Sequence, residues 1–189
     1  MALVVGDLHG NLDKALAFLD YRPKEKHIFI GDYVDSFEES VERMLLTLKA
    51  VLESDAELLL GNHDLHYFSE SPFRCSGYNY HAFYDYNQIF EAFLDRWKPA
   101  LAIDGFLITH AGISEGFGNS LLKTTDVEKA AEKITIEWRR YLDTRFLRKP
   151  NKARITERIF YISQSRRSEE RRVGKECEVP CRSRWSPYH

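Results

Sequence analysis

The chain has 189 residues, 43% of which are hydrophobic, and its formal net charge is −2 at pH 7. This length suits one domain with a sizeable core, and the near-neutral charge offers no basic footprint for nucleic acid and no polybasic patch for a membrane. The apolar run at the N-terminus is too short for a signal peptide. We therefore expect a soluble, cytoplasmic protein of one domain, with neither nucleic acid nor a membrane as its partner.

The first part of the chain repeats a unit of short strand, loop and helix. Asn11 and the apolar residues after it have the spacing of a capped helix, and Val41 begins a longer helix with one apolar face. Such units predict right-handed crossovers and a largely parallel sheet, whose carboxyl ends open on one edge. The strands are predicted at residues 3–5, 27–30 and 58–60, and they run into the motifs GDLHG, GDYVDS and GNHD.

The middle of the chain loses this pattern. Between Tyr67 and about Tyr86, aromatic residues crowd an insert, which we expect either to roof the site or to pack in the core. Beyond it, Asp104-Gly105 between two short apolar runs is a strong signal for an antiparallel hairpin, so that the sheet should be mixed. The later elements are predicted as strands at 101–103, 106–109 and 159–162, and as helices ending near 97 and running from 126 to about 141.

The sequence changes character after Ser165. Residues 166–189 have no hydrophobic periodicity, and the pieces SEERRVGKEC and CRSRWSPYH within them resemble translated adapter or vector sequence. We therefore expect a domain at 1–165 that is incomplete at its C-terminus, followed by a disordered, non-native tail. An ordinary disordered basic tail is the alternative. The three cysteines, Cys75, Cys177 and Cys181, do not have the spacing of a zinc site.

Polar residues follow the predicted strand ends at a repeated offset. Asp7 and His9 come just beyond the first strand, Asp32 follows the second, and Asn62 with His63 follows the third, each close after a glycine. One Asp-x-His pair would occur by chance, but three repetitions argue against coincidence. A glycine at a strand end lets the backbone bend sharply, often with a positive φ, and so brings such side chains together above the sheet edge.

The predicted metal donors are carboxylates, imidazoles and an amide, without a thiolate. This set suits a pair of divalent ions such as Mn, Fe or Zn better than calcium. If Asp32 lies centrally, its two oxygens can bridge both ions, which lie about 3.5–4 Å apart in such pairs. We expect a water between the ions to become hydroxide and to attack phosphorus in line, while the ions offset charge on the phosphate. The donors are Asp7, His9, Asp32, Asn62 and His110.

The motifs GDLHG, GDYVDS, GNHD and THAG resemble the calcineurin-like metallophosphoesterase superfamily, and they are most similar to its serine/threonine-phosphatase and diadenosine-tetraphosphatase branch. The resemblance covers about residues 3–165. It implies an α/β fold of the four-layer sandwich type, with mixed, mostly parallel β-sheets flanked by helices. It also implies that Asp7, His9 and Asp32 hold a first metal ion. By the same resemblance, a second ion takes Asp32, Asn62 and His110.

The resemblance also implies which residues act on the leaving group. His63 would be the general acid, and Asp35 in the preceding motif would orient its imidazolium. We expect Asp64, next to His63, to support a ligand without touching a metal. His66 and His81 do not follow a strand-end glycine, and we expect them to be surface or packing residues.

The sequence departs from the family pattern in two places. Ser36 stands where protein phosphatases of this group carry an arginine, so that one phosphate-binding cation is missing, and we expect Ser36 to cap the next helix. No Gly-His pair follows His110, and the only later histidine is His189, so that the second metal lacks a ligand.

Taken with the four motifs, the sequence predicts a metal-dependent phosphoesterase that hydrolyses a phosphomonoester or a nucleotide polyphosphate, with a small molecule, a nucleotide or a phosphoprotein as substrate. The alternative is a catalytically silent, truncated fragment.

Overall fold

The computed structural model describes residues 1–71, 74–144 and 146, and its centre is a parallel sheet. The strands lie in the order β1–β2–β3–β4, and each pairs in parallel with the next. All their carboxyl ends therefore lie at one edge of the sheet, as the repeated units predicted for the first three strands. The fourth strand was not predicted: the helix expected to end near residue 97 stops earlier, and Trp97 begins β4. The strands are β1 (Ala2–Val5), β2 (Lys26–Phe29), β3 (Glu57–Leu59) and β4 (Trp97–Lys98).

Each of the first two crossovers contains one helix with a side-chain cap. The Asn11 side chain accepts a hydrogen bond from a backbone N–H in the first turn of α1 (Leu12–Asp20), as predicted. Ser40 caps α2 (Val41–Glu53) in the same way. The prediction for Ser36 is wrong, because its hydroxyl accepts from two backbone N–H groups of the turn before that helix and does not reach the helix itself.

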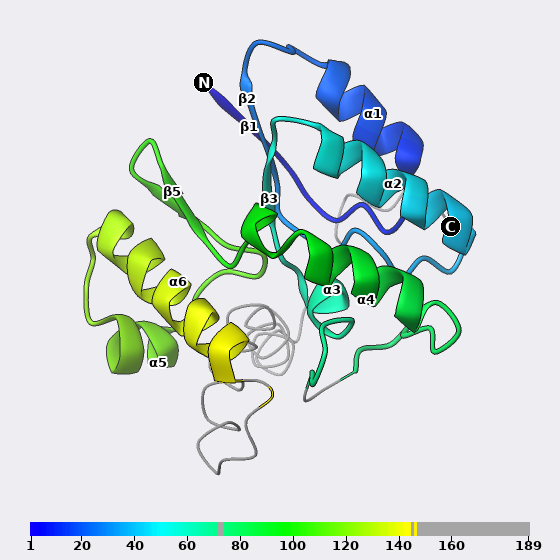
Figure 1. Ribbon diagram of the computed structural model, residues 1–189. Coiled ribbons are helices and arrows are strands. Elements are labelled where there is room, and N and C mark those ends of the chain that lie inside the picture. Colours follow the sequence, from blue (N-terminus) through cyan, green and yellow to red (C-terminus); the bar gives the residue numbers. More distant parts are fainter. Residues whose placement is uncertain (72–73, 145, 147–189) are drawn as a thin grey trace, which may run out of the picture.

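The crossover between β3 and β4 holds the aromatic insert. Tyr67 and Tyr86 are fully buried in the main core, whereas Tyr80 and Tyr84 are about two-thirds exposed, at 66% and 67%. Core packing therefore accounts for the first pair and leaves the second pair at the surface. Figure 1 shows α1, α2 and α4 on one side of the strands and α6 with the hairpin on the other. The helical elements of this crossover are α3 (Asn62–Leu65), α4 (Phe83–Ala92) and η1 (Leu94–Arg96).

The residues after β4 form a second, antiparallel sheet. Asp104 and Gly105 join its two strands with φ values of 50° and 77°, the left-handed conformation that a tight two-residue turn requires. The predicted mixture of parallel and antiparallel pairing is therefore present, but it is divided between two sheets. The Asp126 side chain accepts from a backbone N–H and begins the long helix, as predicted. The elements are β5 (Leu101–Ile103), β6 (Phe106–Ile108), α5 (Glu115–Phe117), η2 (Gly118–Leu122) and α6 (Val127–Thr144).

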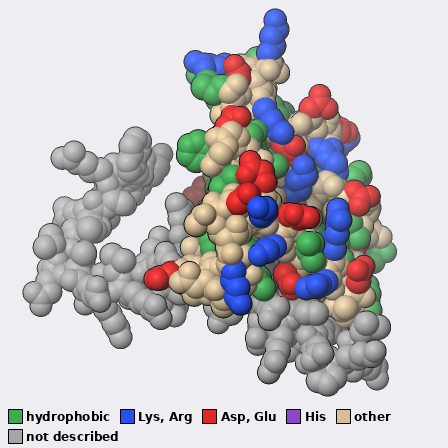
Figure 2. All heavy atoms as spheres, turned by 90° about the vertical axis from the view of Figure 1, so that its left-hand side faces the viewer, with side chains coloured by type: hydrophobic (Ala, Val, Ile, Leu, Met, Phe, Trp, Pro, Cys, Tyr) green, Lys and Arg blue, Asp and Glu red, His purple; other side chains and the backbone are tan. Residues whose placement is uncertain are grey.

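Two hydrophobic clusters hold these elements together. The larger cluster packs β2, β3, α2 and the insert, and it includes Trp138 of α6. The smaller cluster, around Ile134, joins α6 to α5, η2 and β6. On the face that Figure 2 shows, the acidic and basic side chains of the described residues are interspersed, and neither sign forms an extended patch. Of the helices in the described ranges, none combines the length and the apolar character needed to cross a bilayer.

Some predictions fall on residues outside the described ranges. They are the strand at 159–162, the end of the domain at 165, the tail at 166–189 with His189, and the cysteines Cys177 and Cys181.

Candidate metal centre

Three loops meet at the carboxyl edge of the parallel sheet, after β1, β2 and β3. The N–H groups of Leu8 and His9 donate to the carbonyl oxygen of Asp32 at 3.0 and 2.8 Å, which ties the first loop to the second. Gly31 has a φ of 109°, and a Cβ atom there would lie 2.2 Å from the Gly61 nitrogen. A Cβ atom on Gly61 would lie 2.1 Å from Asp32 Oδ1. These two motif glycines therefore allow the second and third loops to touch.

Asp64 ties the second loop to the third. Its Oδ2 accepts the backbone N–H groups of Asp32 and Gly61 at 2.7 and 2.8 Å, and its Oδ1 accepts that of Tyr33 at 2.8 Å. Burial raises the pKa of Asp64 well above its ordinary value, and repulsion from the Asp32 carboxylate is the second largest cause. The three N–H donors lower this pKa, but they do not offset the rise. The Asp64 side chain thus holds the backbone of the loop that carries Asp32.

The residues predicted for a first metal ion come together. Ligand atoms of Asp7, His9 and Asp32 all lie within 4.8 Å of one another. His9 Nε2 lies 4.0 Å from Asp32 Oδ2, and His9 Nδ1 lies 3.0 Å from the carbonyl oxygen of Val34. Asp7 is exposed and Asp32 is buried, so that this group opens to solvent on one side.

The residues predicted for a second ion meet at the same carboxylate oxygen. His110, two residues after β6, places its Nε2 3.5 Å from Asp32 Oδ2 and 3.2 Å from Asn62 Oδ1. Its Nδ1 lies 2.8 Å from the carbonyl oxygen of Ile30. Asp32 therefore lies between His9 and His110, the central position that a bridging carboxylate needs.

This donor set fits divalent cations. A carbonyl oxygen can only accept, so we assign the ring proton of both His9 and His110 to Nδ1, which leaves the Nε2 lone pairs directed toward Asp32. The nitrogen of the Asn62 side chain contacts Cys75 Sγ at 3.1 Å, and its oxygen faces His110. Acceptor atoms thus gather around one carboxylate, an arrangement that a bound cation stabilises.

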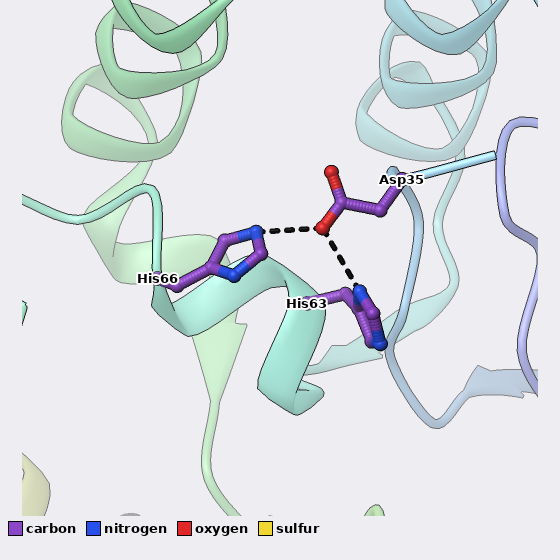
Figure 3. A group of neighbouring side chains, drawn as sticks. All are labelled: Asp35, His63 and His66. Carbon is purple, nitrogen blue, oxygen red and sulfur yellow. Dashed lines mark hydrogen bonds and ion pairs between the residues drawn. The ribbon is translucent and has the colours of Figure 1, made fainter. Parts of the chain in front are cut away.

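A second cluster adjoins this centre and is centred on Asp35 (Figure 3). Asp35 Oδ2 lies 2.9 Å from His63 Nδ1 and 2.6 Å from His66 Nε2, and Asp35 Oδ1 accepts the Tyr67 hydroxyl at 2.5 Å. Burial alone would raise the pKa of Asp35, but the hydrogen bonds from His63, His66 and Tyr67 outweigh it, so that this pKa is lowered. The ring centroid of His63 lies 5.2 Å from that of His9, which places His63 beside the metal-ligand group.

With this geometry in place, the comparisons identify the family. A family model described as Calcineurin-like phosphoesterase matches residues 2–170, most of the chain. The chain belongs to this family. Membership confirms the resemblance of the four motifs and the mostly parallel α/β fold. The family uses divalent metal ions, in agreement with the candidate ligand groups.

A relative of this calcineurin-like phosphoesterase is the mouse (Mus musculus) protein named Serine/threonine-protein phosphatase with EF-hands 2. It is 26% identical over 95% of the chain, and the chain spans 27% of that relative's length. No solved structure matches the chain significantly.

Sequence reasoning missed one part of the site of this calcineurin-like phosphoesterase. His66 is buried, as a packing residue would be, but it contacts Asp35 directly. The available signal was its position three residues after His63 at the end of a short helix, because residues at that spacing lie on the same side. His81 is exposed, as expected for a surface residue.

Proposed function

We propose that this calcineurin-like phosphoesterase hydrolyses a phosphoester with two divalent ions, one held by Asp7, His9 and Asp32 and the other by Asp32, Asn62 and His110. The observation that carries the proposal is the position of the Asp32 carboxylate between the Nε2 atoms of two histidines, each of which contacts a backbone carbonyl oxygen through Nδ1. When bound, the ions neutralise charge on the phosphate and lower the pKa of a water molecule so that it can act as the nucleophile.

His63 is the proton donor in this proposal. Asp35 holds His63 Nδ1 at 2.9 Å, so that Nε2 is the nitrogen left to deliver a proton to the leaving oxygen. The carboxylate of Asp35 also stabilises the charged imidazolium, which must form before the proton is delivered. We assign metal binding to the group around Asp32 and proton transfer to the group around Asp35. In the second group both histidines direct a ring nitrogen at the Asp35 carboxylate, so that these atoms already have a partner within the protein.

The substrate class that we propose is a small phosphomonoester or a nucleotide polyphosphate. Ser36 holds a local turn where protein phosphatases of this group carry an arginine, so that this loop offers the phosphate no cation there. Tyr80 and Tyr84 of the insert are exposed and could stack on a nucleobase. A phosphoprotein is the competing class, because the mouse relative is named a protein phosphatase. A substrate panel of phosphopeptides, phosphomonoesters and dinucleoside polyphosphates separates the two classes.

The mechanism is tested by hydrolysis of p-nitrophenyl phosphate and phenyl phosphate with added Mn, in the parent chain and in Asp32→Asn and His63→Ala. Asp32→Asn should abolish turnover of both substrates, because it removes the charge shared by the two ions. His63→Ala should lower kcat on phenyl phosphate by about 10²–10⁴-fold and have a smaller effect on p-nitrophenyl phosphate, whose leaving group needs no proton.

Asp13→Asn, at an exposed ion pair, is the control and should match the parent. Activity that survives both site substitutions would refute the mechanism. A parent chain without turnover would favour the silent-fragment alternative. Replacing Mn with Fe or Zn in the same assay tests our proposal that the ions are Mn, Fe or Zn. The cytoplasmic location, and the domain boundary at 165 with its non-native tail, stay predictions.

A further inference from the structure

His66 lies behind the proton donor, on the same carboxylate. The residue is 2% exposed, and Figure 3 shows its ring and that of His63 converging on Asp35 from the same short helical segment. Two polar contacts hold the ring: Nε2 lies 2.6 Å from Asp35 Oδ2, and Nδ1 lies 3.0 Å from the backbone nitrogen of Cys75. A buried imidazole with a partner on each nitrogen has a defined orientation.

These contacts fix where the His66 proton lies. A backbone N–H can only donate, so Nδ1 accepts from Cys75 and carries no proton. A neutral imidazole then has its proton on Nε2, the atom that lies 2.6 Å from Asp35 Oδ2. His66 is therefore neutral, with its protonated nitrogen next to Asp35, whereas His63 is the ring that lies beside the candidate metal-ligand group.

The Asp35 carboxylate is held on both oxygens. Oδ2 receives both imidazoles, and Oδ1 receives the Tyr67 hydroxyl, whose oxygen in turn accepts the N–H of Asn79 at 2.8 Å. If the carboxylate rotated about its bond to Cβ, it would lose the buried hydrogen bond from Tyr67 and the close contact with His66. Tyr67 and His66 thus fix the direction in which Asp35 presents Oδ2 to His63.

We propose that His66 is a positioning residue for proton transfer, donating from Nε2 to Asp35 so that this carboxylate directs the His63 ring toward the leaving group. This inference rests on the proposed phosphoesterase function and adds a residue to it. The competing interpretation is that His66 only fastens the insert to the core through its contact with Cys75.

Two substitutions separate these interpretations, because each keeps one of the two hydrogen bonds. In His66→Gln the amide N–H₂ occupies the region of Nε2 and can donate to Asp35, whereas in His66→Asn the shorter side chain reaches the region of Nδ1 and can accept from Cys75. Each variant is assayed as the full chain with Mn on phenyl phosphate, a poor leaving group, and on p-nitrophenyl phosphate, a good one. His81→Asn, at an exposed histidine, is the control.

We expect His66→Asn to lower kcat on phenyl phosphate by about 10–100-fold, the range for losing a partner that orients a ligand or active group, with KM nearly unchanged. On p-nitrophenyl phosphate the same variant should stay within a few-fold of the parent, and His66→Gln should recover most of the activity on phenyl phosphate. Equal losses on both substrates, or a larger loss in His66→Gln than in His66→Asn, would overturn the inference in favour of the fastening role.

A spectroscopic measurement tests the same point without turnover. Nitrogen-15 NMR of the metal-free parent chain should show the His66 proton on Nε2 and an unprotonated Nδ1. A proton on Nδ1 would overturn the inference even if the kinetics agreed with it. A parent chain that hydrolyses neither substrate would instead refute the proposed function, so that the two failures are distinguishable.

Discussion

Replacing Asp64 with asparagine should weaken both the fold and the metal centre, because Asp64 accepts three buried N–H groups. The asparagine oxygen can replace Oδ2 and keep the bonds from Asp32 and Gly61, but its amide nitrogen then faces the N–H of Tyr33. One buried donor is left unpaired, which costs about 1–3 kcal/mol, and two bonds to a charged acceptor become neutral ones, which costs about 1 kcal/mol each.

Part of this loss is recovered, since burial and Asp32 raise the pKa of Asp64 and the variant removes that unfavourable charge. We therefore expect Asp64→Asn to lower the free energy of unfolding by about 3 kcal/mol, a fall in Tm of about 6–12 °C for a chain of this size. Urea and thermal unfolding in the presence of a chelator measure this directly. Asp13→Asn removes one exposed ion pair with Arg43 and should change stability by less than about 1 kcal/mol.

Asp64→Asn should also bind Mn more weakly than the parent chain, by about 10–100-fold, because Asp64 holds the loop that presents Asp32. The rise in Tm on adding Mn should accordingly be smaller in Asp64→Asn than in the parent chain. A variant with the Tm and the Mn response of the parent would refute the idea that Asp64 holds the two loops together.

Two other substitutions test the geometry and the charges. Gly61→Ala, at an ordinary extended φ, should lower activity by about 10²-fold because its Cβ would lie 2.1 Å from Asp32 Oδ1 and displace that carboxylate by about 1 Å. Gly116→Ala, where a Cβ meets nothing within 4 Å, is the matched control and should be active. Burial would raise the pKa of Glu57, but hydrogen bonds from two lysines lower it, so its contribution to stability is present above the ordinary pKa and is lost as the pH falls through the lowered one. Glu57→Gln should therefore lose less stability than the parent chain on acidification from about pH 5 to pH 3; an unchanged slope of unfolding free energy against pH would contradict this.

The strand-end part of the site could be predicted from the sequence because its determinants are local. A short apolar run followed by glycine and a polar residue specifies a buried strand and a sharp exit, and three such units in a parallel sheet must bring Asp7, Asp32 and Asn62 to the same edge. His110 joins them from a different sheet. The sequence placed it after the second strand of the hairpin, but nothing in a hairpin signal says where that strand will end in space.

The support behind Asp35 could not be predicted in this way. Tyr67, Cys75 and Asn79 lie in the insert, which has no hydrophobic period, and their contacts depend on how that segment folds back over α3. Tertiary packing decides such contacts, and aromatic residues without periodicity are compatible with either a core or a surface position. The insert contains both, with Tyr67 buried against Asp35 and Tyr80 exposed.

The backbone of the loops carries a further mark of function. His9, Asp32 and Asp35 have φ values of 46°, 55° and 66°, a left-handed conformation that costs about 1–2 kcal/mol for a residue other than glycine, somewhat less for Asp and His. Glycine would relieve this strain at each position, but it would also delete a side chain that faces the candidate metal centre or the proposed proton donor. Bonds from the backbone N–H of His9 to Asp32 and from that of Asp32 to Asp64 hold two of these residues in place. Residues other than glycine normally avoid a positive φ, and these three adopt it where the proposed chemistry needs a side chain on a sharply turning backbone. Strained residues are expected to persist at such sites.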